Sequence, residues 1–391
     1  MVARQTRMQF ISFIAKNVLR RKVRSALTGV GVAVAIAAVV ALLGVSRGFE
    51  ESSRSMLKDR GVDIVVIRGG LGQQNTARID ESIGQKIAAL PEVDKVAPVL
   101  IDRVKFQETT VPVPVTGYSP GSFAIENLHI LPENGHNLTA GDKDGVMLGA
   151  ILSRNLGKKV GDKVTIEARP FSVVGVFQGK SMVENGGAVA RLIDLQKLMD
   201  RVAQVSEFQV VLKGEFKENE DALKRVQDRV KTFTDPSGKP YGLEAQTTED
   251  YVNKSNEVRL SQAMAWMTSA IALIIGAVGM LNTMIMSVLE RTQEIGILRA
   301  IGWRKIRVMR MILWESFALS LAGAAVGTLA ALVLTRALSR LPAANGLVEP
   351  SVSPTVIGIG FLMSLLVGLI GGAYPAFRGA SLAPTEALRY E

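Results

Sequence analysis

Few side chains in this 391-residue chain are of a type and spacing that could do catalytic chemistry. The absence of cysteine excludes thiol nucleophiles, disulfides and iron–sulfur ligands. The two histidines, His129 and His136, lie in a stretch rich in Gly, Asn and Pro without a convincing third metal ligand, so we expect exposed loop histidines and no metal site. Neither a G-x-x-x-x-G-K-[ST] phosphate loop nor a G-x-S-x-G nucleophile motif occurs. We therefore predict no catalytic residue, and we interpret the many carboxylates as charged surface.

One polar segment lies between two apolar stretches and is the most informative part of the chain. It reads Glu290-Arg-Thr-Gln-Glu-Ile-Gly-Ile-Leu-Arg-Ala-Ile-Gly-Trp303 and places Ile295, Leu298 and Ile301 at helical spacing, with charges between them. Such a short amphipathic helix needs a cover for its apolar residues. The cover is either lipid headgroups or a cytoplasmic partner.

Polar and aromatic residues inside or beside the apolar stretches are candidates for a second role. Glu315 is the one charged residue within them, and a carboxylate there needs water or a partner. Because it lies about one helical turn inside its stretch, we expect it to reach the interface or to hold a neighbouring helix rather than to line an ion pathway. Asn282 is expected to hydrogen-bond between helices, and Trp266 and Trp314 to lie at the membrane interface.

Small residues recur within the apolar stretches. Gly276 and Gly279 are three residues apart, and Gly323 and Gly327 form a G-x-x-x-G pair. Such spacing lets two helices approach closely, although glycine is also common in membrane helices generally. We expect these glycines to support tight helix packing within or between subunits.

Four apolar windows must position these residues. They are Ala26–Ser46, Ala263–Leu289, Met311–Thr335 and Thr355–Phe377, and each is about as long as the ~20 residues that span a bilayer. A hydrophobic content of 48% and a mean hydropathy of +0.24 are high for a soluble protein, and the excess collects in these windows. The first window is too long for a typical signal peptide and no A-x-A site follows it, so we predict a retained anchor.

The basic residues predict the orientation of the spans. Segments 1–25, 286–310 and 376–391 together hold 15 basic and 4 acidic residues, whereas the whole chain has a net charge of +10. Lysine and arginine mark cytoplasmic loops, so both termini and the loop between spans two and three are expected inside. Nucleic-acid binding is disfavoured because the basic residues flank apolar spans and lack interleaved aromatic residues.

This topology divides the chain into consecutive segments. They are an amphipathic cytoplasmic helix (1–25), span one (26–46), an extracytoplasmic domain (47–262), span two (263–289), a cytoplasmic loop (290–310), span three (311–335), a short outer loop (336–354), span four (355–377) and a cytoplasmic tail (378–391).

The extracytoplasmic domain shows two β-α-β patterns separated by a different sequence. The first comprises a strand at Val62–Ile67, a helix at Asp80–Leu90 and a strand at Lys95–Ile101, and the second runs from Glu207 to Thr247 with its helix at Glu218–Phe233. Residues 119–200, between them, are rich in turns and short strands. We predict an α+β domain, split by an inserted β-rich subdomain, and a helical stalk into span two.

The segment ERTQEIGILRAIGW resembles the signature of MacB/FtsX-like ABC transporter permeases of the mechanotransmission (type VII) class. Three further pieces match in the family's order, namely NVLRRKVRSALTGVGVAVAIAAVVAL, Trp314-Glu315-Ser316 at the start of span three, and YPAFRGASLAPTEALRYE. The resemblance implies a four-span α-helical membrane protein of a bacterial inner membrane. Its large α+β periplasmic domain would be porter-like and split.

The resemblance also implies partners. The permease would pair with a second copy of itself or a homologous permease and would bind two cytoplasmic ABC ATPase subunits, which would carry ATP and Mg, while this chain holds no cofactor. A periplasmic adaptor of the membrane fusion type stays open, and no nucleic acid is expected. The loop would be the coupling helix that docks into the ATPase, through the positions that match the signature: Glu290, Arg291, Glu294, Ile295, Gly296, Leu298, Arg299, Ala300 and Gly302.

Three functions are compatible with these patterns. We expect a non-catalytic permease subunit that exports or extracts a drug, peptide, lipid or lipoprotein. The alternative is an ATPase-coupled signalling protein that controls a periplasmic partner, such as a cell-wall hydrolase, without moving cargo. A membrane-anchored enzyme is the least favoured, because the outer domain shows no catalytic motif.

Overall fold

The computed structural model describes most of the chain, namely residues 22–70, 78–126, 128, 130–179, 181–217, 219–340 and 352–382. Most of the predicted amphipathic helix of residues 1–25, His129, and much of the predicted outer loop and tail lie outside this part.

The chain divides into two compact units. The membrane unit comprises Met1–Arg47, Ser261–Leu338 and Pro350–Glu391, and the outer unit comprises Gly48–Leu260 and Ser339–Glu349. Three long helices contain residues of both units, and the first two of them along the chain connect the membrane unit to residues Gly48–Leu260.

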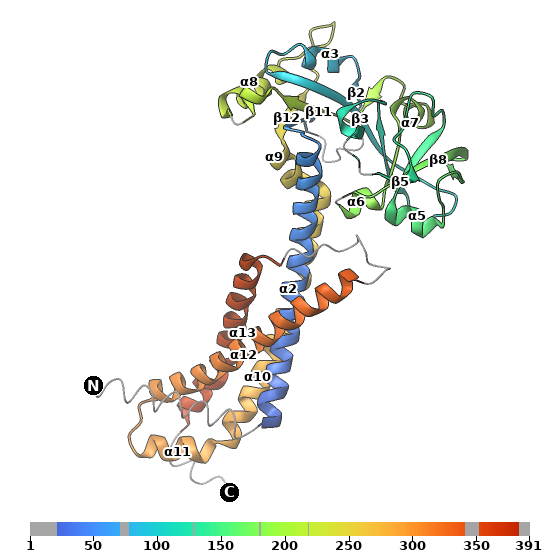
Figure 1. Ribbon diagram of the computed structural model, residues 1–391. Helices are drawn as coiled ribbons and strands as arrows, with labels where there is room; N and C mark the ends of the chain where they lie inside the picture. The colour runs from blue at the N-terminus through green and yellow to red at the C-terminus, as the bar shows by residue number, and fades with distance from the viewer. Residues whose placement is uncertain are drawn as a thin grey trace. The chain divides into compact units, whose positions relative to one another are not determined.

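The described residues include four helices that are long and apolar enough to cross a membrane (Figure 1). They are α2 (Lys22–Asp59), α10 (Asn256–Glu290), α12 (Lys305–Arg340) and α13 (Pro354–Ser381). Each contains one predicted window, so the prediction of four apolar helices is confirmed. Helices α2 and α10 extend well beyond their windows because the flanking polar sequence contains no proline to end them.

Buried side chains from all four helices form one apolar cluster in the membrane unit, with Ile36, Met280, Ile312 and Val367 among its members. The short helix α11 (Thr292–Ala300) joins α10 to α12 and contributes Ile295 to the same cluster. The loop between spans two and three is therefore packed onto the membrane unit.

The outer unit contains a mixed sheet that has ten strands within the described residues, ordered β12-β1-β11-β3-β4-β9-β6-β8-β5 with β7 beside β8. The first elements of the outer unit along the chain are β1 (Ile64–Arg68), β2 (Ile79–Asp80), α3 (Ile83–Ala88) and β3 (Val93–Val104). Its last elements are β10 (Gln204–Val205), β11 (Glu207–Leu212), η2 (Gly214–Phe216), α8 (Glu220–Lys231), β12 (Leu243–Thr247) and α9 (Thr248–Lys254). The short strands β2 and β10 form a separate pair.

The elements between β3 and β10 form the middle of the outer unit. They are β4 (Val113–Tyr118), α4 (Phe123–Glu126), β5 (Ile130–Gly135), β6 (Gly145–Gly149), α5 (Ala150–Leu156), β7 (Lys163–Ile166), β8 (Arg169–Phe177), α6 (Met182–Asn185), β9 (Ala188–Arg191) and α7 (Leu192–Leu198). We call β4 to α7 the inserted part, and the remaining outer elements from β1 to α9 the core part.

The long strand β3 joins the two parts into one sheet. Its first half, Val93–Val99, pairs with β11 of the core part, and its second half, Val99–Val104, pairs with β4 of the inserted part. The two pairings meet at Val99. The inserted part, which begins with β4 before the predicted boundary at residue 119, is therefore continuous with the sheet of the core part, a continuity that the strand pattern alone does not reveal.

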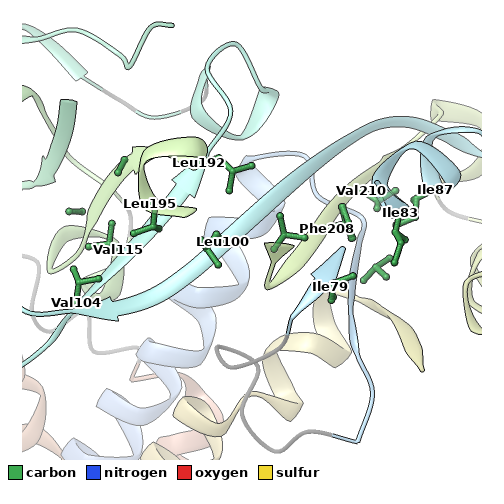
Figure 2. Close-up of a cluster of buried hydrophobic side chains, with 14 of the residues drawn as sticks. Ile79, Ile83, Ile87, Leu100, Val104, Val115, Leu192, Leu195, Phe208 and Val210 are labelled. Carbon is green, nitrogen blue, oxygen red and sulfur yellow. The ribbon is translucent and has the colours of Figure 1, made fainter. Parts of the chain in front are cut away.

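The predicted β-α-β patterns correspond to β1-α3-β3 and β11-α8-β12. Helix α8 is amphipathic: Ala222, Val226 and Val230 are buried, and the Asn219 side chain caps its first turn by accepting hydrogen bonds from Asp221 N and Ala222 N. Figure 2 shows how the core packs around β3, with Ile83 and Ile87 of α3 near Val210 and Phe208 of β11, and Leu100 between these and Leu195 of α7.

Candidate functional site

Two turns set the ends of α11. Helix α10 ends at Glu290, and Arg291 leaves the helical conformation with φ −109° and ψ 18° before α11 begins at Thr292. At the far end Gly302 has φ +100°, a conformation that favours glycine, and Trp303 N donates to Leu298 O. The predicted site residue Gly302 thus makes the turn that leads to α12.

The inward face of α11 is buried against the membrane unit. Ile295 and Gly296 are buried, and Leu298 is half-buried against the same apolar cluster. A methyl group built at Gly379 of α13 would lie 2.9 Å from Val288 and 3.7 Å from Ile295. The last turn of α13 therefore helps to cover Ile295, which is only 2% exposed.

A buried ion pair lies at the start of α11. The Arg291 Nη1 donates to Glu315 Oε2 at 3.0 Å, and the two residues are 8% and 7% exposed. Thr292 adds a hydrogen bond from its hydroxyl to Leu289 O at 2.7 Å. The pair connects the end of α10 to α12, so it fixes where α11 begins.

The outward face of α11 is open and mixed in chemistry. Glu290, Gln293, Glu294 and Ala300 are exposed, and Ile297 and Ile301 expose 47% and 74% of their surface. At 100° per residue, positions 294, 297 and 301 share one face, whereas 291, 295 and 298 share another. The apolar residues predicted as one stripe therefore divide, with Ile295 and Leu298 inward and Ile301 outward.

Basic residues follow this face into α12. Arg299 is half-buried and donates from Nη1 to Trp303 O at 3.0 Å, and the Arg307 guanidinium lies 4.6 Å from the centroid of the Trp303 ring. Arg304 and Lys305 are exposed. The open surface thus combines an acidic group, two isoleucines and a basic turn, a combination suited to docking onto protein.

Of the glycines predicted to support packing, three face neighbouring helices. A methyl group at Gly276 would lie 2.9 Å from Ala35 Cβ, at Gly323 2.8 Å from Val32 Cγ1, and at Gly327 2.4 Å from Ala33 O. All three neighbours are in α2. Gly279 has open space around its Cα.

The remaining predicted membrane residues lie on the surface of the membrane unit. Asn282 is exposed, as are Trp266 and Trp314, and Trp314 packs edge-on against Phe317 with ring centroids 5.3 Å apart. Exposed positions on these helices are available to lipid or to another chain.

Gly368 and Gly372 of span four also fit close helix packing, but the sequence patterns did not identify α12 as the neighbour of α13 there. A methyl group at Gly372 would lie 2.2 Å from Ser316 Oγ, and one at Gly368 would lie 2.5 Å from Ser320 Oγ. The signal that could have found it is the i,i+4 spacing shared by the two serines and the two glycines. The partner of Glu315 could have been found in a similar way, by looking for an arginine at the end of span two, which precedes span three.

Within the described residues, no group of three or more His, Cys, Asp or Glu side chains is arranged to hold a metal ion. His136 is exposed, and its Nδ1 lies 3.9 Å from Asp142 Oδ2. Burial raises the pKa of Asp142, but hydrogen bonds from Thr139 and the charges of His136 and Arg191 together hold that pKa below its ordinary value. The contacts of Asp142 with Thr139 and His136 stabilise a surface turn.

Two protein families match this chain. The MacB-like periplasmic core domain family matches residues 25–232, and the FtsX-like permease C-terminal family matches residues 266–384. Together the matches cover most of the first span, most of the outer unit, and most of the three membrane helices that follow it.

Relatives align over nearly the whole chain. An uncharacterized ABC transporter permease of Methanocaldococcus jannaschii is 27% identical over 97% of this chain and 98% of its own length, and the uncharacterized ABC transporter permease YknZ of Bacillus subtilis is 23% identical with the same coverage. The macrolide export ATP-binding/permease protein MacB of Bdellovibrio bacteriovorus is 26% identical over 95% of this chain. The chain spans 60% of the length of that MacB protein.

Two solved structures resemble the outer region. The periplasmic region of MacB from Actinobacillus actinomycetemcomitans is 16% identical, with a TM-score of 0.38 over 51% of this chain and 95% of that one. The extracellular domain of the ABC-type transporter YknZ is 13% identical, with a TM-score of 0.35 over 47% of this chain and 98% of that one.

Proposed function

This chain belongs to the MacB/FtsX-like family of ABC transporter permeases, and from that premise we propose that it couples ATP hydrolysis on a separate cytoplasmic ATPase to movement of its outer unit. It is a multi-pass membrane protein with an extracytoplasmic domain. In this proposal the chain itself is non-catalytic, two ATPase subunits bind ATP and Mg, and two permease copies, identical or homologous, form the membrane part.

The observation that carries the proposal is the division of α11 into an anchored face and an open face. Arg291, Ile295 and Leu298 hold the helix on the membrane unit, while Glu294, Ile297 and Ile301 are presented to solvent. A helix that only covered the bundle would bury its isoleucines. Exposed isoleucines beside a charge are suited to a protein groove, where apolar area supports affinity and the charge supports orientation.

The charge distribution favours the cytoplasm as the location of this face. The loop and both termini carry the excess of lysine and arginine, so the positive-inside rule places α11 inside and the outer unit outside. The lipid headgroup cover considered from the sequence is less favoured, because Glu294 lies on the same face as Ile297 and Ile301 and would meet anionic headgroups.

The cargo is proposed by class only. Among the relatives, MacB proteins are named for macrolide export and PvdT of Pseudomonas syringae for pyoverdine export. We propose export, or extraction from the outer leaflet, of a drug, peptide, lipid or lipoprotein, with a periplasmic adaptor as a further partner. Regulation of a periplasmic protein without cargo is the competing outcome.

The test uses full-length permease reconstituted in vesicles with its cognate ATPase. A Glu294→Lys, Ile301→Asp double variant should lose ATPase binding and at least tenfold of the permease-dependent stimulation of ATP hydrolysis. A matched variant, Glu249→Lys with Ile193→Asp, places the same changes at exposed positions of the outer unit and should keep both. Normal stimulation in the first variant would contradict the proposal.

Cargo movement is measured in the same vesicles. ATP-dependent transfer of a fluorescent macrolide or a labelled lipid would support transport. Stimulated hydrolysis without transfer of any tested probe, together with ATP-dependent control of a periplasmic hydrolase, would instead support the regulatory function.

A further inference from the structure

The two helical connections of the outer segment Gly48–Leu260 end against the same sheet. Helix α2 ends at Asp59, and α9 closes at Lys254, just before α10 begins at Asn256. Leu57, Val65 and Val252 are buried in one apolar cluster, so both connections pack against β1. Polar side chains lie beside this cluster.

Arg60, the first residue after α2, binds the inserted part. It is 7% exposed, and its Nη2 donates to Glu184 Oε1 of α6 at 2.5 Å. Its Nη1 donates to the hydroxyl of Tyr118 at the end of β4, and its guanidinium lies 5.3 Å from the Tyr118 ring centroid. The first connection is therefore held to α6 and β4 of the inserted part, in addition to its apolar packing on β1 of the core part.

Tyr251, on α9, binds the core part, at a carboxylate that the charge of Arg60 also reaches. Its hydroxyl donates to Glu207 Oε2 of β11 at 2.5 Å, and the other oxygen of Glu207 accepts from Gln209 Nε2 at 3.1 Å. Glu207 is 2% exposed. The second connection is therefore held to β11.

A contribution to folding stability is a weak explanation for the buried charges of Arg60 and Glu184. Replacing a buried ion pair with apolar residues of similar volume is often neutral or stabilising, because two desolvated charges cost about as much as their attraction returns. A guanidinium that is hydrogen-bonded to a carboxylate and a phenol is held in one orientation, whereas an apolar contact does not fix the orientation of the side chain. The charges thus fit a role in positioning.

We propose that Arg60 and Tyr251 are positioning residues that transmit displacements of the first and second spans to different parts of the outer unit. Arg60 carries the first span's movement to the inserted part, and Tyr251 carries the second span's movement to the core part. Since β3 joins these parts at Val99, a relative shift of the two spans bends the sheet there. The inference rests on the proposed function and specifies how the outer unit responds.

The chain has no cysteine, so spin labels can be placed on introduced cysteines alone. One label replaces Val160, which is exposed in the inserted part, and the other replaces Lys224, which is exposed on α8 of the core part. Electron–electron distance measurements on full-length permease with its cognate ATPase in nanodiscs compare the nucleotide-free state with ATP and vanadate. We expect the distance distribution to shift in the parent protein.

Variants then separate transmission from folding. Arg60→Met, Arg60→Met with Glu184→Met, and Tyr251→Phe should each remove most of the shift while ATPase stimulation stays within twofold. The double variant leaves no unpaired carboxylate at Glu184, so its loss of the shift would not reflect a buried charge without a partner. Arg191→Met is the matched control, because Arg191 forms a buried pair with Asp194 at 2.6 Å within the inserted part and contacts neither connection.

Each outcome decides the inference. A shift lost in the Arg60 and Tyr251 variants and kept in Arg191→Met supports transmission. A full shift in Arg60→Met, equal losses in Arg191→Met, or no shift in a parent protein that stimulates its ATPase would overturn it. Loss of stimulation in the parent protein would instead contradict the proposed function itself.

Discussion

The Arg291 guanidinium and the Glu315 carboxylate are bonded at 3.0 Å between the end of α10 and the first third of α12. Both residues are buried, and the chain passes directly from Arg291 into α11. Neither α10 nor α12 can move away from the start of α11 without breaking this ion pair. The exposed face of α11 is therefore held in a fixed place on the membrane unit. This relationship makes α11 a firm attachment point.

Breaking this pair should weaken the membrane unit. Removing one partner of a buried pair typically costs about 3–5 kcal/mol, so Arg291→Met and Glu315→Leu should each lower the thermal midpoint. All three tryptophans, Trp266, Trp303 and Trp314, belong to the membrane unit, so tryptophan fluorescence of the detergent-solubilised protein reports on it. The Arg291→Met, Glu315→Leu double variant should recover more than half of the loss. Losses that simply add would argue against a direct pair.

The two faces of α11 should respond differently to the same substitution. Ile295→Asp places a charge in the apolar cluster and should lower the thermal midpoint of the membrane unit. Ile301→Asp should leave that midpoint unchanged and weaken ATPase binding at least tenfold, as measured by surface plasmon resonance with the permease in nanodiscs. Equal thermal effects of the two variants would contradict the assignment of the faces.

Glycine substitutions should separate packed from open positions. Gly327→Ala would place a methyl group 2.4 Å from Ala33 O, so α2 and α12 must move apart, a change that typically costs about 1–3 kcal/mol. Gly279→Ala meets no atom within 4 Å and should be tolerated in a single copy. Tryptophan fluorescence melts compare the two. A loss of stability in Gly279→Ala that depends on protein concentration would place a second copy against that surface.

The stability of the outer unit should carry a pH dependence from Glu207. Burial raises the pKa of Glu207 above its ordinary value of 4.5, against hydrogen bonds from Tyr251 and Gln209 and the charge of Arg60, which lower it. The folded chain thus binds more protons than the unfolded chain between 4.5 and the raised pKa, so this contribution to stability is lost as the pH rises through that window.

Glu207→Gln should remove that dependence. Relative to the parent protein, the variant should gain stability as the pH rises from 4.5 to 8. Thiol labelling of a cysteine that replaces the buried Ala190 measures opening of the outer unit during heating, free of background in a chain without native cysteine. Parallel pH profiles for the two proteins would show that Glu207 is ionised equally in both states.

The sequence predicted those features that depend on local pattern. A run of some 20 apolar residues is sufficient to identify a span, and the amphipathic helix at Glu220–Lys231 shows its buried face in its spacing. The end of α2 was less predictable, because a polar helical extension has the composition of a loop, whereas the helical stalk that begins α10 was predicted.

Features that depend on contacts distant in sequence were not predictable in the same way. The antiparallel pairing of β3 with β11 joins residues more than 100 positions apart, such as Val99 and Glu207, and no local pattern specifies it. The signature motif names Arg291 and Glu294 together, yet the first is buried on Glu315 and the second is exposed. Only the packing of α11 on its neighbours decides which residues stay available to a partner.

Site-specific crosslinking tests the central claim most directly. Single cysteines replacing Ile295, Ile297 or Ile301 are labelled with benzophenone maleimide in the full-length permease before its cognate ATPase is added, and the complex is irradiated. Positions 297 and 301 should yield covalent adducts with the ATPase, and position 295 should yield none. Adducts from position 295 at the yield of position 301, or no adduct from either 297 or 301, would contradict docking through the exposed face of α11.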